Sequence, residues 1–237
     1  DGVLGVVYLI FNEGYAATAG ESLIRHELCA EAIRLARLVV RLMPDEPEAL
    51  GLLALLLLHD ARGTTRVDED GALVLMADQD RTRWDHAQIA EGVALVEQAL
   101  RRSRQGRGPG AYQVQAAIAA VHCESATADD TDWQQIVGLY ELLMRIDPTP
   151  IVALNHAVAV AMMCGPAAGL DLIDSLDSLH PHALDNVHVY HATRGDLLRR
   201  LEQWTPSAAA YERAIALVTN DAERDYLARR LREVRGS

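Results

Sequence analysis

The amino-acid sequence predicts an all-α protein built from stacked helical hairpins. Half of its residues are hydrophobic but only 5% are aromatic, so the core must consist mainly of Leu, Ala, Val and Ile. That composition suits closely packed helices better than a β-sandwich, which favours aromatic and β-branched residues. Apolar residues also recur at steps of three and four, and one spacing pattern is repeated along the chain. With 237 residues, we expect one domain with an ample core.

The expected domain covers residues 1–237 and has one interruption. The first helical hairpins occupy 1–61, an insertion occupies 62–85, and further hairpins with a C-terminal capping helix occupy 86–237. Eleven helices are expected, over 3–12, 23–42, 47–58, 85–103, 112–126, 132–147, 150–163, 168–179, 184–202, 206–218 and 221–234.

Start and stop signals separate these helices. Gly14 and Pro44 are expected to end the first two. Capping boxes are expected where Asp or Asn precedes an acid or amide by three residues. Thr149 and Thr205, each followed by Pro, are expected N-caps. Residues 16–22 and 104–110 read as connectors, and the capping boxes begin at Asp45, Asp85, Asp132 and Asn220.

The third helix, 47–58, is rich in Leu on all sides, which predicts a position at the centre of the fold. The insertion at 62–85 breaks the helical rhythm. Its Asp70-Gly71 pair is typical of a tight turn and is flanked by apolar stretches. We expect a short β-hairpin or an ordered irregular loop there.

One spacing of apolar residues is typical of the second helix of a tetratricopeptide repeat (TPR) hairpin. Three positions lie four and then three residues apart, and a proline follows five residues later. Two of the sets lie 33 residues apart, which supports a solenoid of helical hairpins. The sets are Ile136/Tyr140/Leu143/Pro148, Gly169/Ile173/Leu176/Pro181, Ala32/Ala36/Val39/Pro44, and Ser207/Tyr211/Ala214 with Thr219 in place of Pro.

Charge and cysteine usage restrict the possible partners. The net charge is −12, from 34 acids and 22 bases, so the chain is not expected to bind DNA or RNA by itself. Cys29, Cys123 and Cys164 form no CxxC pair, which fits reduced thiols in a cytoplasmic protein. The longest apolar run is too short to span a bilayer, so no membrane partner is expected. No signal peptide is recognised, and the start at Asp1 suggests a piece of a longer protein.

Enzyme motifs are weak, and we expect no catalytic residue, cofactor or metal ion. The sequence from Gly106 to Ala111 matches GxGxxA, but it follows a helix instead of a strand. His26-Glu27 lacks the second His of a zinc-protease helix. His180, His182, His188 and His191 could in principle bind a metal, but no cysteine or carboxylate completes a tetrahedral set, so structural histidines are favoured.

The richest polar cluster lies in and next to the insertion. Closely spaced acids and arginines could form an acid–base or cation site, or they could tie an irregular loop to the helices. The tying role is favoured, because structural ion-pair networks are common. The same alternatives apply to the polar end of the first helix. The residues are Asp60, Arg62, Asp78, Asp80, Arg81, Arg83, Trp84 and Asp85 in the cluster, and Asn12, Glu13 and Tyr15 at the helix end.

A series of motifs runs along nearly the whole chain. They are Tyr8-Leu-Ile-Phe-Asn-Glu-Gly-Tyr15, Leu50-Gly-Leu-Leu-Ala-Leu55, His59-Asp-Ala-Arg62, Asp78-Gln-Asp-Arg81, Tyr112-Gln113 with Gln115-Ala-Ala-Ile118, Asp132-Trp133, Leu154-Asn155, Asp196-Leu-Leu-Arg-Arg-Leu201 and Ala222-Glu223-Arg224. Together they resemble the C-terminal extension of a group of extracytoplasmic-function (ECF) sigma factors, the group linked to YCII/DGPF-type proteins. The resemblance implies a TPR-like domain that follows the promoter-reading regions of a bacterial sigma factor and governs its activity.

The chain departs from the pattern of that family at two places. His156 follows Asn155 where the family usually carries Arg, and Glu202-Gln203-Trp204 replaces a Gly-containing turn between the helices of the last hairpin. Sigma regions 2 and 4 are not recognised in this chain.

The function expected from the sequence is therefore regulatory. The chain would bind sigma regions of the same polypeptide, RNA polymerase, a peptide or a regulatory protein, and an acidic surface would steer a basic partner towards it. The alternative is a sensor of a small ligand or peptide, with a groove lined by the Asp78–Asp85 loop and the Asn12–Tyr15 turn.

Overall fold

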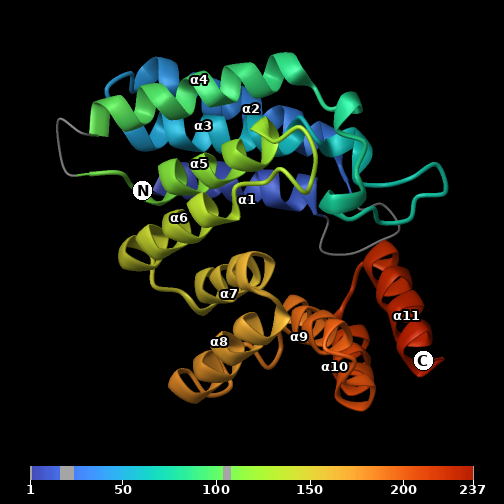
Figure 1. Ribbon diagram of the computed structural model, residues 1–237. Coiled ribbons are helices and arrows are strands. Elements are labelled where there is room, and N and C mark those ends of the chain that lie inside the picture. The colour runs from blue at the N-terminus through green and yellow to red at the C-terminus, as the bar shows by residue number, and fades with distance from the viewer. Residues whose placement is uncertain (1, 17–23, 104–107, 237) are drawn as a thin grey trace. The chain divides into compact units, whose positions relative to one another are not determined.

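The computed structural model describes residues 2–16, 24–103 and 108–236, and these are helix and loop (Figure 1). The all-α prediction is confirmed, with eleven α-helices and three short 3-10 helices in the described residues. The predicted connector 16–22 lies largely outside them, and so do residues 104–107, which include the first two residues of the GxGxxA match. Residues 108–110 are loop, as predicted for the connector 104–110. Contacts divide the chain into two compact units, residues 1–132 (unit 1) and 133–237 (unit 2). The expectation of a single domain stays a prediction.

Unit 1 is organised around its third helix. The helix α3 packs against each of the other four α-helices of the unit, and every residue from Ala49 to Leu58 is buried. This confirms that the Leu-rich helix is central, since a helix that is apolar all round must be covered on every side. The helices are α1 (Gly2–Tyr15), α2 (His26–Leu42), α3 (Pro47–Asp60), α4 (His86–Ser103) and α5 (Ala111–Glu124).

Gly14 does not end the first helix, contrary to the prediction. It lies inside α1, which continues to Tyr15. A Cβ atom at Gly14 would lie 2.7 Å from the backbone nitrogen of Cys29 and 2.9 Å from its sulfur. The absence of a side chain at Gly14 therefore permits the close approach of α1 to α2.

Two of the predicted caps in unit 1 can be judged. Asp85 accepts a hydrogen bond from the backbone nitrogen of Gln88 at 2.9 Å, so this cap of α4 is confirmed. The cap of α3 is Glu46 and not Asp45. Glu48, the expected partner in that capping box, instead accepts hydrogen bonds at 3.1 Å from the backbone nitrogens of Tyr112 and Gln113 at the start of α5. A carboxylate from one helix thus satisfies the free N–H groups of another.

The insertion is an irregular loop with three short helical turns: η1 (Gly63–Thr65), η2 (Met76–Asp78) and η3 (Arg81–Arg83). Of the expected β-hairpin, only an isolated antiparallel bridge between Val67 and Leu73 is present in the described residues. The turn does lie at the predicted place, with Gly71 at a positive φ of 79°.

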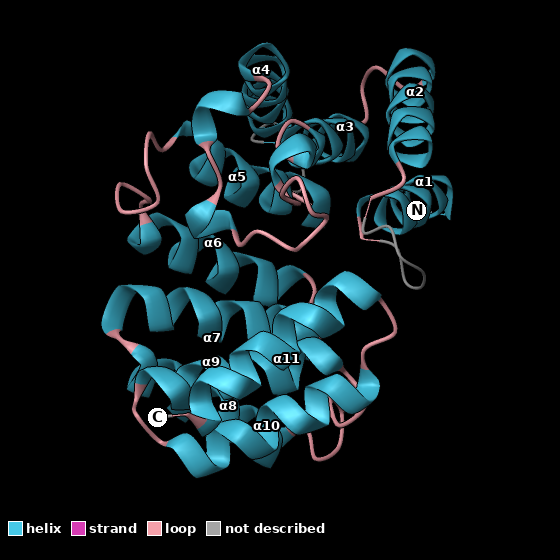
Figure 2. Ribbon diagram, turned by 90° about the vertical axis from the view of Figure 1, so that its right-hand side faces the viewer, coloured by secondary structure: helices cyan, strands magenta, loops and turns pink. Residues whose placement is uncertain are grey.

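Unit 2 is a series of helices in which each packs on the next (Figure 2). The close approach within the hairpins uses glycine. A Cβ atom at Gly169 would lie 2.5 Å from that of Ala161, and one at Gly195 would lie 3.1 Å from the ring of Tyr211. The helices are α6 (Trp133–Ile146), α7 (Pro150–Cys164), α8 (Pro166–Leu179), α9 (His188–Arg200), α10 (Trp204–Leu217) and α11 (Asp221–Arg235).

The helix ends of unit 2 confirm two predicted caps and correct one. Thr149 is the N-cap of α7 and Pro150 follows it in the first turn, as predicted, although the side chain of Thr149 makes no capping hydrogen bond. Thr205 lies inside α10, whose N-cap is Gln203. Asn220 caps α11 as predicted, since its side-chain oxygen accepts from the backbone nitrogen of Glu223 at 3.3 Å. Before α10, the turn that lacks the expected glycine holds Glu202 at a positive φ of 58°.

Along residues 2–16, 24–103 and 108–236, no helix combines the length and the apolar character that crossing a bilayer requires.

Candidate functional site

The predicted polar residues meet in unit 1 around Arg62, which is only 2% exposed. Its guanidinium group contacts His59 Nδ1 at 2.8 Å and donates to the sulfur of Met76 at 3.1 Å. A longer contact of 3.4 Å reaches the hydroxyl oxygen of Tyr15. The Nε atom of Arg62 is buried and has no hydrogen-bond partner among the described residues.

Two further arginines flank this group. Arg66 lies over the ring of Tyr15, 3.8 Å from its centroid, and donates to the backbone oxygen of Tyr15. Arg81 donates to the backbone oxygens of His122 and Ser125, at 2.8 Å each. We call Arg62, Arg66 and Arg81 the arginine cluster.

The ring of Trp84 connects two members of the arginine cluster. The guanidinium carbon of Arg81 lies 4.8 Å from the ring centroid and that of Arg62 lies 5.9 Å from it. The indole nitrogen of Trp84 donates to the hydroxyl of Thr65 at 2.9 Å, and Thr65 also contacts Gln79. The Asp78–Asp85 loop, through Trp84, and the end of α1, through Tyr15, therefore both contact Arg62.

The predicted acids do not pair with these arginines. Asp60 accepts from the side chain of Gln88 at 2.9 Å. Asp80 accepts from the backbone nitrogen of Thr82, and Asp85 caps α4. Asp78 is exposed. Among the described residues, no carboxylate forms an ion pair with any member of the cluster. The loop is thus tied through backbone oxygens and aromatic rings, whereas Asp80 and Asp85 bind backbone N–H groups two and three residues ahead of them.

The other predicted residues lie elsewhere. Glu13 forms an ion pair with Arg25 at 3.0 Å, and the backbone oxygen of Asn12 accepts from Ala16. Arg83 is exposed on the third short turn. Asn155 is exposed on α7, in unit 2.

The cluster changes the titration of two neighbouring histidines. Burial lowers the pKa of His59 well below its usual value, and the charges of Arg62 and Arg66 lower it further. Burial together with Arg62 and Arg81 lowers the pKa of His122 to about 4. Both imidazoles are therefore neutral at physiological pH, and the positive charge of this region resides on the arginines.

Sequence reasoning did not predict the roles of His59, Thr65, Met76, Gln79 and His122. His59 stands three residues before Arg62, and this spacing was a usable signal because side chains three apart are neighbours on a helix. His122 is 41 positions from Arg81, and no local pattern joins them.

Three histidines of unit 2 contact an acidic residue. His182 contacts Asp185 at 2.7 Å, and His188 contacts Glu223 at 3.3 Å. His191 contacts the backbone oxygen of Asp185. In the part of the chain that the structure describes, no group of three or more His, Cys, Asp or Glu side chains could hold a metal ion.

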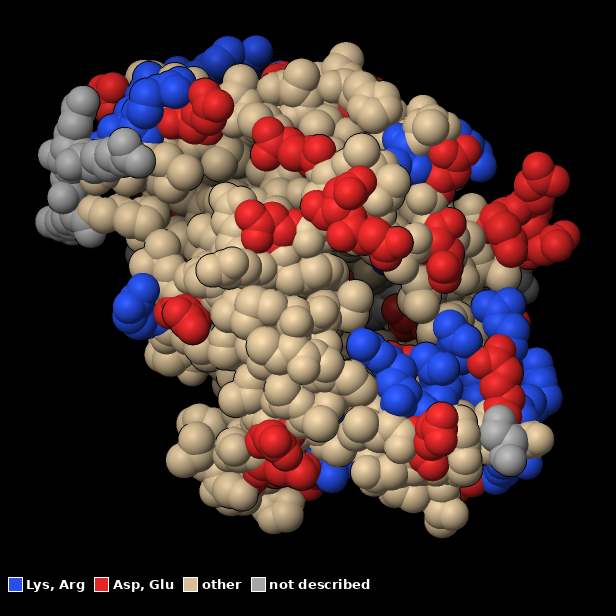
Figure 3. Space-filling model, in the orientation of Figure 1, with Lys and Arg blue, Asp and Glu red and all other residues tan. Residues whose placement is uncertain are grey.

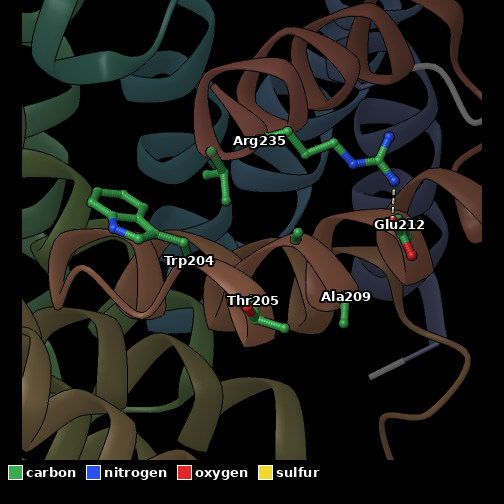
Figure 4. A pocket seen from close by; sticks show the side chains of 7 residues that line it. Trp204, Thr205, Ala209, Glu212 and Arg235 are labelled. Carbon is green, nitrogen blue, oxygen red and sulfur yellow. Dashed lines mark hydrogen bonds and ion pairs between the residues drawn. The ribbon is translucent and has the colours of Figure 1, made fainter. Parts of the chain in front are cut away.

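Unit 2 contains an open pocket of about 470 Å³ beside α10 and the end of α11 (Figure 4). Trp204 and Thr205 lie on one side, and an ion pair between Arg235 and Glu212 lies on the other. Ala208, Ala209 and Val234 complete the lining.

A second pocket, of about 330 Å³, lies among α6, α7 and α8 and is mostly apolar. Two polar atoms of its lining, Nε2 of His156 and Oγ1 of Thr149, are buried without a hydrogen-bond partner among the described residues. Burial lowers the pKa of His156, so its ring is neutral. We call this the α7–α8 pocket; it is also lined by Met144, Pro148, Pro150, Ala153, Leu172, Ser175, Leu176, Leu179 and His180.

The stacked hairpins define a helical-repeat fold of the TPR type. A solved structure of TTC0263, described as a thermophilic TPR protein in Thermus thermophilus, superposes with a TM-score of 0.60. The match covers 100% of this chain and 98% of that chain at 11% sequence identity. At this identity the likeness shows the fold and confirms the predicted class.

Two sequence comparisons add relatives. Residues 1–100 match a family of unknown function, DUF6596. "Uncharacterized protein R00370" of Rhizobium meliloti (strain 1021) is 45% identical over 225 residues, which are 95% of this chain and 51% of that protein. The chain thus spans about half the length of the curated relative it matches.

Proposed function

We propose that this chain is the regulatory, protein-binding part of an ECF sigma factor, working in the cytoplasm and without catalytic activity. The motifs from Tyr8 to Arg224 support this link, and so does the extra length of the Rhizobium relative. A sigma factor that carried such an extension would need that additional chain for its promoter-reading regions.

The observation that carries the docking function is the α7–α8 pocket. It is apolar, and two of its buried polar atoms lack partners among the described residues. An unsatisfied buried polar group costs free energy until a partner supplies the missing hydrogen bond. An extended segment of a partner protein fits this need, because its apolar side chain fills the pocket and its backbone pairs with His156 or Thr149.

Charge supports a basic partner for unit 1. Residues 1–132 carry 21 acids and 12 arginines, whereas residues 133–237 carry 13 acids and 10 arginines. Figure 3 shows acidic side chains spread over the face of unit 1 and arginines gathered on α11. A DNA-binding sigma region is basic, so opposite potentials would steer it to unit 1.

The test compares the natural protein with a version that lacks residues 1–237, in promoter binding and in transcription by RNA polymerase. We expect the two to differ in initiation. Equal promoter binding and equal initiation would remove the regulatory function.

A variant in the α7–α8 pocket tests whether this pocket is the docking surface. Ala153→Phe fills the α7–α8 pocket, whereas Ala167→Phe adds the same side chain at an exposed position of α8 outside the pocket lining. We expect only Ala153→Phe to reproduce the deletion. Equal behaviour of the two variants, with helical circular dichroism retained, would place the docking surface elsewhere.

The second candidate is a sensor of a small ligand, and the arginine cluster favours it. A buried arginine without a carboxylate partner is costly to keep. Ligand binding would raise the melting temperature Tm by mass action.

A further inference from the structure

Arg62 is a buried cation that lacks a counter-ion among the described residues. We propose that the arginine cluster binds a small oxyanion-bearing ligand, through phosphate or carboxylate oxygens. This inference rests on the sensor candidate and is independent of the docking function.

The burial of Arg62 is the first argument. The residue is 2% exposed, and its partners are a thioether, a phenol oxygen and an imidazole nitrogen. None of these carries a negative charge. A buried guanidinium group normally keeps its charge and pairs with an anion, because it cannot deprotonate. The Nε of Arg62, which has no partner in the described part of the chain, leaves a donor for one oxygen atom.

The second argument compares Arg62 with the arginines of this chain that form ion pairs. Within the described residues, nine arginines form an ion pair with a carboxylate, namely Arg25, Arg34, Arg37, Arg101, Arg194, Arg199, Arg224, Arg230 and Arg235. All nine side chains are at least 24% exposed, so they depend less on a partner. The arginine of unit 1 that needs an anion most has no carboxylate partner in this part of the chain. An anion bound from solution would supply the negative charge that Arg62 lacks.

The arrangement of the three cations is the third argument. Arg62 and Arg81 share the ring of Trp84, and Arg62 and Arg66 share Tyr15. The cations therefore lie on two aromatic side chains that meet at Arg62. The three guanidinium groups thus bring together several N–H donors of the kind that binds carboxylate and phosphate oxygens.

The nearby acids make their hydrogen bonds with other groups. Asp130 lies close enough to affect Arg81 but accepts from the hydroxyl of Thr127 at 2.7 Å. Asp60 accepts from Gln88. Within the described residues, the N–H groups of the arginine cluster are therefore not used in ion pairs with these carboxylates.

The experiment follows the Tm of the full chain during titration with sodium phosphate, sodium acetate or sodium chloride at one fixed ionic strength. We expect phosphate, acetate or both to raise Tm by about 2–4 °C more than chloride does, with a rise that follows the logarithm of the anion concentration once the site is filled. The acetate and phosphate arms identify which oxyanion is preferred. A rise in direct proportion to concentration is the general salting effect of such ions and counts against a site.

Variants separate a site from a structural role. Arg66→Gln and Arg81→Gln should each abolish the logarithmic rise of Tm, while Arg34→Gln, which removes an equally charged but exposed side chain, should keep it. Arg62→Met removes the buried charge and keeps much of the volume, so it should fold and lose the rise. A retained logarithmic rise in Arg66→Gln and Arg81→Gln, or its absence in the unchanged protein, would overturn the proposal. Neither result would affect the transcription test of the docking function.

Discussion

The two units of this chain pack their helices in different ways. In unit 2 each helix packs on the next in sequence, as in a repeat protein whose contacts are mainly between neighbours. In unit 1 a single helix, α3, contacts the other four α-helices, and an irregular loop holds the arginine cluster. Unit 2 is therefore built mainly from contacts between helices that follow each other in the sequence, whereas the candidate ligand site depends on contacts between residues far apart in the sequence.

The largest effect is expected at the centre of unit 1. Leu56 is completely buried in α3, and its replacement by Ala leaves a cavity that neighbouring helices cannot fill. Leu56→Ala should lower the free energy of unfolding by about 2–5 kcal/mol in urea titration followed by circular dichroism. The control is Leu42→Ala on α2, where the side chain is 72% exposed and the change should be within about 0.5 kcal/mol. Equal effects would show that α3 is not the central helix.

The second effect is the pH dependence of stability that comes from a histidine beside the arginine cluster. His122 has a pKa of about 4 in the folded chain, against 6.5 ordinarily. The unfolded chain therefore binds the proton first as pH falls, and stability contributed by the neutral imidazole is lost between about pH 6.5 and 4. Between about pH 7.5 and 5 the loss from this residue should be about 2 kcal/mol.

A variant assigns that loss to the histidine. His122→Gln should reduce the fall in stability between about pH 7.5 and 5, while His86→Gln, at an exposed position of α4, should leave it unchanged. Urea titration at the two pH values makes the measurement. An unchanged fall in His122→Gln would mean that the imidazole is protonated in the folded state.

Features that depend on local contacts could be predicted from the sequence better than features that depend on long-range contacts. The positions of the repeat in unit 2, such as Ile173 and Ala214, are fully buried as expected, because helical spacing places them on one face. The central position of α3 was also predictable from its Leu content. These features depend on residues three to five positions apart.

The candidate site could be predicted only in part. Arg62, Arg81, Trp84 and Tyr15 were recognised as polar and aromatic residues of interest, and the structure brings them together. Their partners were not foreseen, since the closely spaced acids and arginines suggested an ion-pair network. The actual partner of Arg81 is the backbone of His122, and a backbone oxygen leaves no trace in composition.

The third effect tests close packing in unit 2. Gly169→Ala places a methyl group 2.5 Å from the Cβ atom of Ala161 and 2.8 Å from the backbone oxygen of Ala157. The overlap should outweigh the better helix propensity of Ala, for a net loss of about 1–2 kcal/mol. Gly138→Ala on α6 is the matched control, because nothing lies within 4 Å of the new methyl group. That control should gain up to about 1 kcal/mol, and a gain in both variants would mean that α7 and α8 adjust freely.

The smallest effect concerns the turn between α9 and α10. Glu202 adopts a φ of 58°, in the left-handed region that disfavours residues with a side chain. The family resemblance led us to expect a glycine in this turn. The backbone has the conformation that glycine favours, but the residue is Glu202. Glu202→Gly should therefore raise the free energy of unfolding by about 0.5–1 kcal/mol, because the relief of strain exceeds the added freedom of the unfolded chain. Glu202→Ala removes the charge and keeps the strain, so it should give no comparable gain in urea titration. If both variants gained equally, the charge of Glu202 would be the destabilising feature, and the strain would be absorbed by the α9–α10 turn.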